Sequence, residues 1–275
     1  RSSYGLGEVI KAALDNHTEH LVISLGGIGS FDGGAGMLQA LGATFYDDEA
    51  QIVDMRKGAD LIKYIRRIDL SGVHPQLAKV NIQLMSDFSS RLYGKKSEIM
   101  QTYESLELSQ NEAAEIDNLI WYFSELFKNE LKIAMGPIER GGAGGGIAAV
   151  LNSLYQAEIL TSHELVNQIT HLENLIQQAD LIIFGEGLKE EDQILETTTI
   201  RIAELTQQYN KPAIAICATN DKFDLFESLN VTAMFNTFID MPDSYTDFKM
   251  GIQIRHYTVQ ALKLLKTQIN LPLSS

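Results

Sequence analysis

A short apolar run, a glycine-rich loop and an apolar helix pattern follow one another within residues 21–45. Residues 21–25 are apolar apart from one serine and favour a β-strand. Apolar side chains then recur at helical spacing from Met37 to Phe45, so the loop between them is a strand-to-helix turn. That turn holds six glycines: Gly26, Gly27, Gly29, Gly33, Gly34 and Gly36. This order of elements predicts a loop built on an α/β scaffold.

The glycines of this loop lack a Cβ atom, which lets a ligand approach the main chain closely. The helix that follows presents its N-terminus to the loop, and helix N-termini favour anions. Asp32 is the one charged residue in the loop. A tight connection without a ligand is the alternative, but six glycines exceed what a turn requires. The amides predicted to hold an anionic group belong to Gly26, Gly27, Gly33 and Gly34.

A second glycine-rich segment lies at residues 141–146. Its Gly144 and Gly146, followed by Ala149, match a permissive form of the dinucleotide-binding fingerprint, but no clear strand precedes the segment. We interpret it as an anion-binding nest or as a loop for helix packing, and both alternatives stay open. A dinucleotide-dependent oxidoreductase is a further alternative that rests on this fingerprint alone.

Two carboxylates stand where predicted strands end. Asp87 comes just past an apolar run, where it could hold magnesium, position a hydroxyl or only cap a turn. Glu186 lies between Gly185 and Gly187, directly after the apolar run 181–184. Open α/β sheets place ligand groups at such strand ends, so a functional role for Glu186 is favoured over a structural one.

Four segments, taken in order, resemble those of a known family, the ATP-dependent glycerate kinases of the bacterial two-domain type. Residues 26–43 read GGIGSFDGGAGMLQALGA, and the family's segment is similar to GGSATNDGGAGMLQALGA. Residues 2–8, SSYGLGE, resemble the family's SSYGTGE. Residues 141–149 and 179–187 resemble its GAAGGMGAA and DLVITGEG segments. The resemblance therefore extends over nearly the whole chain.

The resemblance implies an enzyme that transfers the γ-phosphate of ATP to a hydroxyl of D-glycerate, with Mg²⁺ as the metal ion. Such a transfer needs amides that hold phosphates, a metal that neutralises charge and a group that positions the accepting hydroxyl. Asp32 is the catalytic residue expected to handle the hydroxyl. Asp87 and Glu186 are expected to hold magnesium and to act as catalytic residues. The further glycines expected to contact substrate or phosphate are Gly142, Gly144, Gly145, Gly185 and Gly187.

The chain departs from the family's pattern at several loops. Ile28 and Phe31 occupy places where the family has serine and asparagine. Residues 103–108 occupy the place of the family's GPQKGA segment and contain neither lysine nor glycine. We also expect that a leading segment of the family, with a lysine-bearing loop, is missing before Arg1. These departures support an alternative function, in which a catalytically impaired relative binds a small acid or a nucleotide.

Composition limits the kinds of partner. The formal net charge is −14, and a nucleic-acid surface needs a basic footprint, so no nucleic-acid partner is expected. No apolar run approaches the length of a membrane span, so no membrane partner is expected. Cys217 is the single cysteine, which excludes an internal disulfide and suits a reducing compartment. We predict a cytoplasmic protein whose partner is its small-molecule substrate, with an oligomer possible.

Strand and helix patterns alternate along 275 residues, of which 45% are hydrophobic, enough for two domains with cores of their own. The predicted strands are 21–25, 80–85, 181–184, 213–217 and 232–235, and the main predicted helices are 113–131, 147–155, 162–178, 196–209 and 248–265. We predict an α/β fold with two domains and mostly parallel sheets. Residues 1–161 are assigned to a glycine-loop domain. Residues 162–275 are assigned to a second α/β domain, a Rossmann- or flavodoxin-like half that we expect to be incomplete in this chain.

Overall fold

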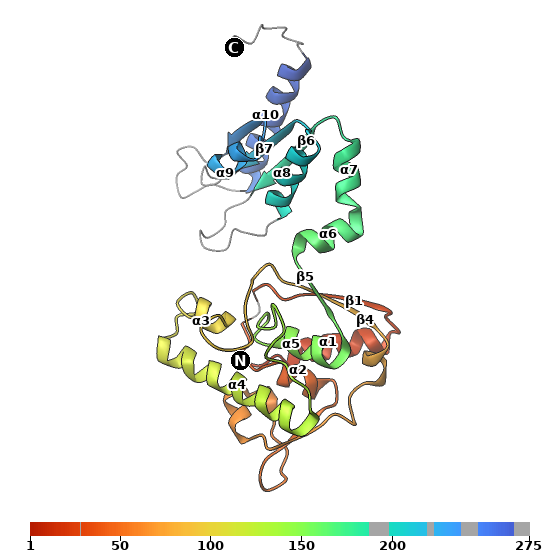
Figure 1. The fold of residues 1–275 in the computed structure, drawn as a ribbon, viewed down its shortest axis with the longest axis vertical. Coiled ribbons are helices and arrows are strands. Elements are labelled where there is room, and N and C mark those ends of the chain that lie inside the picture. The colour runs from red at the N-terminus through yellow and green to blue at the C-terminus, as the bar shows by residue number, and fades with distance from the viewer. Residues whose placement is uncertain (28, 187–197, 219–222, 238–246, 267–275) are drawn as a thin grey trace. The chain divides into compact units, whose positions relative to one another are not determined.

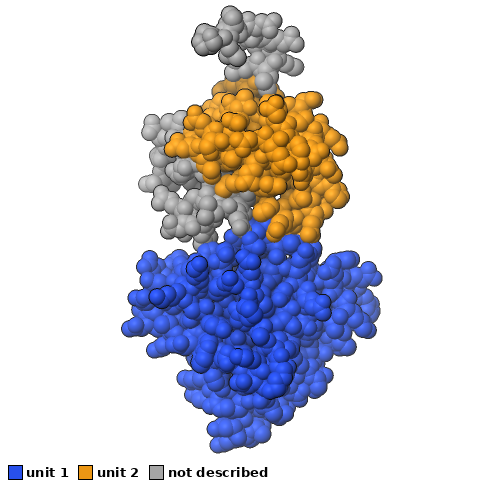
Figure 2. Space-filling view, in the orientation of Figure 1, with its two compact units in different colours: residues 1–162 blue, residues 163–275 orange. Residues whose placement is uncertain are grey.

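The structure is a computed structural model, and it describes residues 1–27, 29–186, 198–218, 223–237 and 247–266. The chain divides into two compact units, Arg1–Ser162 and His163–Ser275 (Figure 2). Each unit has its own parallel sheet and its own hydrophobic clusters. Among the described helices, none has both the length and the apolar character needed to cross a membrane.

Unit 1 opens with helix α1 (Tyr4–Asp15), which buries Ile10 and Leu14, and continues into strand β1 (His20–Ser24). Its other elements, with η marking a 3₁₀ helix, are α2 (Ala35–Ala40), β2 (Thr44–Tyr46), η1 (Met55–Lys57), η2 (Ala59–Tyr64), β3 (Arg67–Asp69), η3 (Pro75–Ala78), β4 (Asn81–Met85), α3 (Glu98–Thr102), α4 (Gln110–Leu131), α5 (Ile147–Tyr155) and β5 (Glu158–Leu160). Helices and strands therefore alternate through most of the unit.

The main sheet of unit 1 is parallel and has the strand order β1–β4–β5. His20 pairs with Asn81 and Gln83 pairs with Glu158, and α1, α2 and α5 lie on the same side of the sheet (Figure 1). Because the strands are parallel, their carboxyl ends share one edge. The loops after β1 and β4 both leave from this edge. A separate antiparallel pair, β2 with β3, completes the strands of the unit.

Helix α4 closes the core of unit 1. Ser109 and Glu112 form a capping box at its N-terminus, which satisfies amides that the helix leaves without partners. Phe123 on its inner face packs edge-to-face against Phe127 and against Phe45 of β2, with ring centroids 4.9 and 5.9 Å apart. All three rings are fully buried, so they anchor α4 to the rest of the unit.

Unit 2 repeats the α/β plan on a second three-stranded sheet with the parallel order β6–β7–β8. Its elements are α6 (Ser162–Thr170), α7 (Leu172–Gln178), β6 (Ile182–Glu186), α8 (Thr198–Gln208), β7 (Ala213–Cys217), α9 (Phe223–Ser228), β8 (Ala233–Asn236) and α10 (Asp247–Lys266). The first residue of α6, Ser162, is the last residue of unit 1. Strand β7 is buried at every residue. Phe184 and Phe226 pack edge-to-face in the core with ring centroids 5.4 Å apart.

These elements confirm the predicted α/β fold with mostly parallel sheets. The prediction of one helix over 162–178 is wrong, because His171 has a left-handed φ of 53° and separates α6 from α7. The three-residue strands β2, β3 and β5 were not predicted. Each is too short to show a hydrophobic period, and each exists through pairing with a distant segment.

Candidate functional site

The first glycine loop leaves the carboxyl edge of the unit 1 sheet after β1. Gly26 and Gly27 are exposed, and the space beside their Cα atoms is open. Gly33 and Gly34 are buried and have φ values of 62° and 78°, a left-handed conformation that glycine adopts without strain. The outer part of the loop is thus accessible to a ligand, whereas the inner part forms the turn into α2.

Asp32 lies inside this turn and is fully buried. Its Oδ2 accepts hydrogen bonds from the Ser3 amide at 2.7 Å, the Ser3 hydroxyl at 2.9 Å and the Gly36 amide at 3.2 Å. Its Oδ1 accepts one from the Gly34 amide at 3.1 Å. The carboxylate therefore ties the start of the chain to the first turn of α2, and the protein's own donors occupy both of its oxygens.

The second glycine loop, residues 141–146, packs directly on the first. The Gly33 amide donates to the Gly145 carbonyl at 2.9 Å. A Cβ atom at Gly145 would collide with the Ser30 carbonyl oxygen, so only glycine allows this approach. Gly144, Gly145 and Gly146 have φ values of 65°, 64° and 103°. The two loops, which are far apart in the sequence, thus form one interlocked structure.

The loop after β4 contacts the second glycine loop from another side. The Gly142 amide donates to the Ser90 carbonyl at 3.3 Å, and a Cβ atom at Gly142 would collide with the Arg91 carbonyl oxygen. Asp87 lies in the same loop with its side chain exposed, and its Oδ1 accepts from the Ser162 amide at 2.7 Å. Asp87 therefore caps the start of α6.

Three predicted site residues belong to unit 2. Gly185 is exposed in β6, and Glu186 is the last residue of that strand. The side chain of Glu186 and the whole of Gly187 lie outside the described residues. The roles assigned to these three residues from the sequence stay predictions.

Glu98, the first residue of α3, was missed by the sequence analysis. Its Oε2 accepts a hydrogen bond from the Gly145 amide at 3.1 Å. Burial raises the pKa of its carboxyl to about 7, although the hydrogen bonds from the Gly145 and Gly144 amides act to lower it. No local pattern marks Glu98, because an acidic residue in the first turn of a helix is ordinary.

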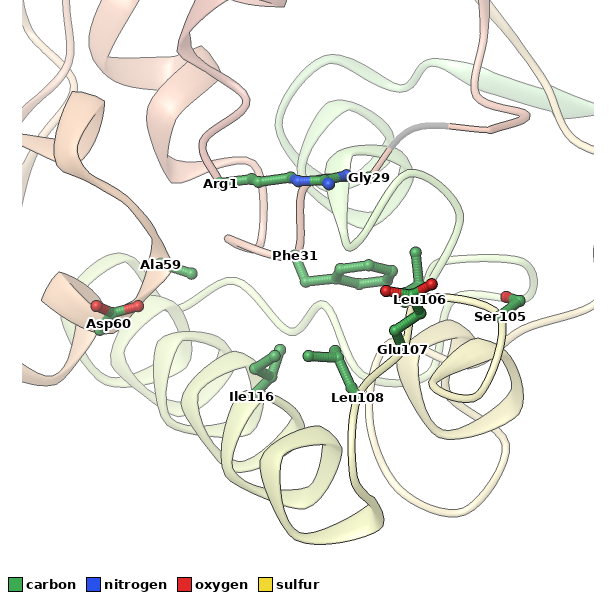
Figure 3. A pocket seen from close by; sticks show the side chains of 10 residues that line it. All are labelled: Arg1, Gly29, Phe31, Ala59, Asp60, Ser105, Leu106, Glu107, Leu108 and Ile116. Atoms are coloured by element: carbon green, nitrogen blue, oxygen red, sulfur yellow. The ribbon is translucent and has the colours of Figure 1, made fainter.

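A pocket of about 480 Å³ opens beside the first glycine loop (Figure 3). Its apolar lining includes Phe31, Leu106, Leu108 and Ile116, and its charged lining consists of Arg1, Asp60 and Glu107. Figure 3 shows the Arg1 side chain running past Gly29, with the Phe31 ring between it and Leu108. Two departures from the family pattern, Phe31 and the segment 103–108, thus meet in one pocket although the sequence separates them.

The described residues contain no group of three or more His, Cys, Asp or Glu side chains arranged to hold a metal ion. Magnesium does not require such a group, because it is commonly held by one or two carboxylates together with substrate phosphates and water. Asp87 is exposed at the carboxyl edge and fits that simpler arrangement.

The sequence pattern of the glycerate kinase family matches residues 1–253. The chain belongs to the glycerate kinase family. This confirms the resemblance seen in the four sequence segments.

Individual members of the glycerate kinase family agree with this assignment. The chain is 31% identical over 218 residues to a glycerate kinase of Halalkalibacterium halodurans, covering 79% of this chain and 57% of that one. It is 29% identical over 236 residues to glycerate 2-kinase of Escherichia coli K12, covering 86% of this chain and 61% of that one. A crystal structure described as glycerate kinase 2 of Salmonella typhimurium LT2 matches with a TM-score of 0.77 and 28% identity, covering 98% of this chain and 70% of that one. The chain thus spans about three fifths of the length of the first two relatives.

Proposed function

We propose that this chain acts as a glycerate kinase, which transfers the γ-phosphate of ATP to a hydroxyl of D-glycerate. The observation that supports this most is the meeting of two glycine loops at the carboxyl edge of the β1–β4–β5 sheet, joined by the bond from the Gly33 amide to the Gly145 carbonyl. Open α/β sheets bind ligands outside the carboxyl ends of their strands. Family membership supplies the reaction class.

In this proposal, backbone amides hold the phosphates. Gly26 and Gly27 are the exposed members of the first loop and are open to a ligand. The other glycines proposed to contact phosphate or substrate are Gly33, Gly34, Gly142, Gly144, Gly145, Gly185 and Gly187. Four of these amides, those of Gly33, Gly34, Gly142 and Gly145, donate to acceptors within the protein in the described structure, so a phosphate would have to displace those acceptors. Amides fixed by buried loops need little reorganisation when charge develops on the transferred group, which favours the transition state.

Magnesium is proposed as the metal ion, and Asp87 and Glu186 are each proposed as a candidate carboxylate for it. When bound, the ion would neutralise charge on the phosphates during transfer. Asp87 suits this role because its side chain is exposed and one of its oxygens is already oriented by the Ser162 amide. We also propose that the enzyme is cytoplasmic, because its one cysteine, Cys217, is buried and cannot form an internal disulfide. The proposed use of ATP agrees with this location.

Asp32 is proposed to act on the accepting hydroxyl. In the described structure its carboxylate holds the loop through five hydrogen bonds, which come from Ser2, Ser3, Gly34 and Gly36. Direct contact with a hydroxyl would require one of these bonds to open. Its proposed contribution therefore includes keeping the loop in the geometry that receives the ligand.

The test is ADP release from ATP and Mg²⁺ with D-glycerate, measured in a coupled assay. The assay is run on this chain, with a related glycerate kinase as the positive control. Glycerate-dependent turnover by this chain supports the proposal. Absence of turnover under conditions where the related enzyme is active would contradict it.

A second candidate is a family member that binds a small acid or a nucleotide without catalysis. The pocket beside Phe31 favours it, because an apolar ring and a lysine-free segment, 103–108, lie where the family pattern has polar residues. Calorimetric titration with D-glycerate and with a non-hydrolysable ATP analogue separates the candidates. Binding of either ligand together with absence of turnover would favour this second candidate over the kinase.

A further inference from the structure

We propose that the carboxylate of Glu98 occupies the place of a ligand oxyanion on the second glycine loop, and that Glu98 competes with phosphate for this loop. The proposal rests on the proposed function only for the identity of the natural ligand, a phosphate group of the nucleotide or of the product. The competition itself is a property of the loop and can be measured without turnover.

The contact between Glu98 and Gly145 carries the first part of the inference. Glu98 Oε2 accepts from the Gly145 amide at 3.1 Å, within a run of three glycines that all have positive φ. The run ends at Gly146, the N-cap of α5, a helix of nine residues. Successive amides at such a position form a concave site for anions, and a carboxylate oxygen is an acceptor of the same kind as a phosphate oxygen. The carboxylate of Glu98 therefore binds this amide in the way that an oxygen of a phosphate ligand would.

Two buried serine hydroxyls lie on segments that pack against the loop, and the hydroxyl of Ser90 faces it. The side-chain oxygens of Ser90 and Ser30 have no hydrogen-bond partner among the described residues, with 2% and 6% of each residue exposed. Ser90 Oγ lies 2.7 Å from the position that a Cβ atom at Gly142 would take, so it faces the loop. Ser30 belongs to the segment that packs on Gly145. Because an unpartnered buried hydroxyl is costly, a tetrahedral oxyanion with additional oxygens suits this site better than a carboxylate does.

The charges around Glu98 allow the exchange. The loop after β4 carries Asp87, Arg91, Lys95 and Lys96, and Glu139 and Arg140 precede the second glycine loop. On α4, Asp117 accepts hydrogen bonds from the Gly94 amide. None of them contributes to the raised pKa of Glu98, which comes from burial. Burial disfavours the charged form of this carboxyl, so its hydrogen bond to the Gly145 amide breaks at a small cost in free energy. An arriving phosphate can therefore displace it.

The test measures sulfate, which keeps its charge near neutral pH, as a probe of the loop in the full chain. Binding is followed by the shift of the Gly145 amide signal in a ¹⁵N–¹H correlation spectrum. We expect Glu98→Gln, which removes the charge and keeps the shape, to bind sulfate about tenfold more tightly than the wild type. Glu98→Ala, which also removes the competing oxygens, is expected to bind at least as tightly as Glu98→Gln. Glu115→Gln removes a charge from the exposed face of α4 and should leave binding unchanged.

A second measurement uses only the wild-type chain, so its result does not depend on whether a variant folds. In the wild-type chain, sulfate affinity should fall by about tenfold between about pH 6 and about pH 8, as Glu98 ionises and competes. A parallel titration with acetate distinguishes a site for tetrahedral oxyanions from a site for carboxylates. Stronger sulfate binding supports phosphate as the natural occupant, and stronger acetate binding would assign the site to a carboxylate and contradict the proposal.

Equal or weaker sulfate binding in Glu98→Gln, or no sulfate binding to any variant, would overturn the inference. Either result leaves the kinase proposal intact if ADP release is observed. Conversely, a protein without turnover whose sulfate affinity rises in Glu98→Gln would keep this inference and lose the kinase proposal. The two proposals therefore fail separately.

Discussion

Asp32 illustrates how a single residue can look catalytic in a sequence and organise a loop in the structure. As the one charge among six glycines, it was assigned to the accepting hydroxyl. The structure surrounds its carboxylate with amide and hydroxyl donors from Ser3, Gly34 and Gly36. Removal of a buried carboxylate that accepts several hydrogen bonds leaves those donors without a partner.

We expect Asp32→Asn to destabilise the fold by about 2 to 4 kcal/mol and to reduce turnover strongly. The amide nitrogen of asparagine would face donors where the carboxylate accepts, so at least one buried hydrogen bond is lost. Urea unfolding measures the stability, and the coupled assay measures turnover at a temperature where the variant is folded. Asp48→Asn, at an exposed turn, is the matched control and should change neither. Wild-type stability in Asp32→Asn would contradict this view of the loop.

Glu98 should make stability depend on pH. Its folded pKa of about 7 exceeds the ordinary value of 4.5, so between these values the folded chain holds a proton that the unfolded chain has released. Stability from this group is therefore fully present below about pH 4.5 and is lost as pH rises toward 7, by at most about 3 kcal/mol. Urea unfolding at about pH 5 and about pH 8 should show this loss in the wild type and not in Glu98→Gln. An equal pH dependence in both proteins would rule out Glu98 as its source.

Among the elements, the two glycine loops differ in what their glycines do. Gly26 and Gly27 are open to solvent, so their lack of a side chain serves access. Gly142 and Gly145 are buried against the carbonyl groups of Arg91 and Ser30, so their lack of a side chain serves packing. The sequence of the second loop is compatible both with anion binding and with helix packing. The structure shows the packing role, and anion binding remains a proposal.

Replacing Gly145 by alanine should cost more than about 3 kcal/mol of stability, because a Cβ atom would meet the Ser30 carbonyl and the φ of 64° disfavours alanine. The matched control is Gly5→Ala, since Gly5 is exposed in α1 with no atom within 4 Å of its added Cβ. That control should gain about 0.5 to 1 kcal/mol through helix propensity. Thermal unfolding of both variants checks the pair. A tolerated Gly145→Ala would mean that the loops do not interlock.

For the whole molecule, the described hydrophobic clusters do not cross the division between the units. The largest extends from Ile10 to Ala157, with partly buried neighbours from Leu6 to Ile159. The two smaller clusters lie within residues 181–261. A unit that contains its own core can fold without its neighbour.

We expect a fragment of residues 1–162 to fold cooperatively, because it keeps the largest cluster and all three strands of the β1–β4–β5 sheet. A fragment of residues 1–156 is the matched comparison. It lacks β5 and its pairing with β4, and it leaves Leu84 of β4, the partner of Ile159, less covered, so it should be clearly less stable. Circular dichroism and urea unfolding of the two fragments decide this. Loss of cooperative unfolding in the longer fragment would show that unit 1 depends on unit 2.

Local sequence patterns were sufficient to predict a large part of the secondary structure of this protein. The apolar runs and helical spacings predicted β1, β4, β6, β7 and β8 within one or two residues, because a strand or helix is encoded in the period of its own side chains. The glycine-rich motifs were also sufficient to indicate the family, since they are contiguous in the chain. Elements of three residues, β2, β3 and β5, carry too few side chains to show a period and went unpredicted.

Contacts between distant segments were decided only when the chain folded. Several of these contacts link parts of the chain that are far apart in the sequence. They are the hydrogen bond from Gly33 to Gly145, the hydrogen bonds that bury Asp32 and the contact of Glu98 with the second loop. The pocket likewise brings Phe31 together with Leu106 and Leu108. No local period specifies them, because they depend on the packing of the whole unit around its sheet. The sequence therefore determines the elements, the motifs and the family, whereas the tertiary structure determines which carboxylates are buried, which amides are occupied and which surface a ligand meets.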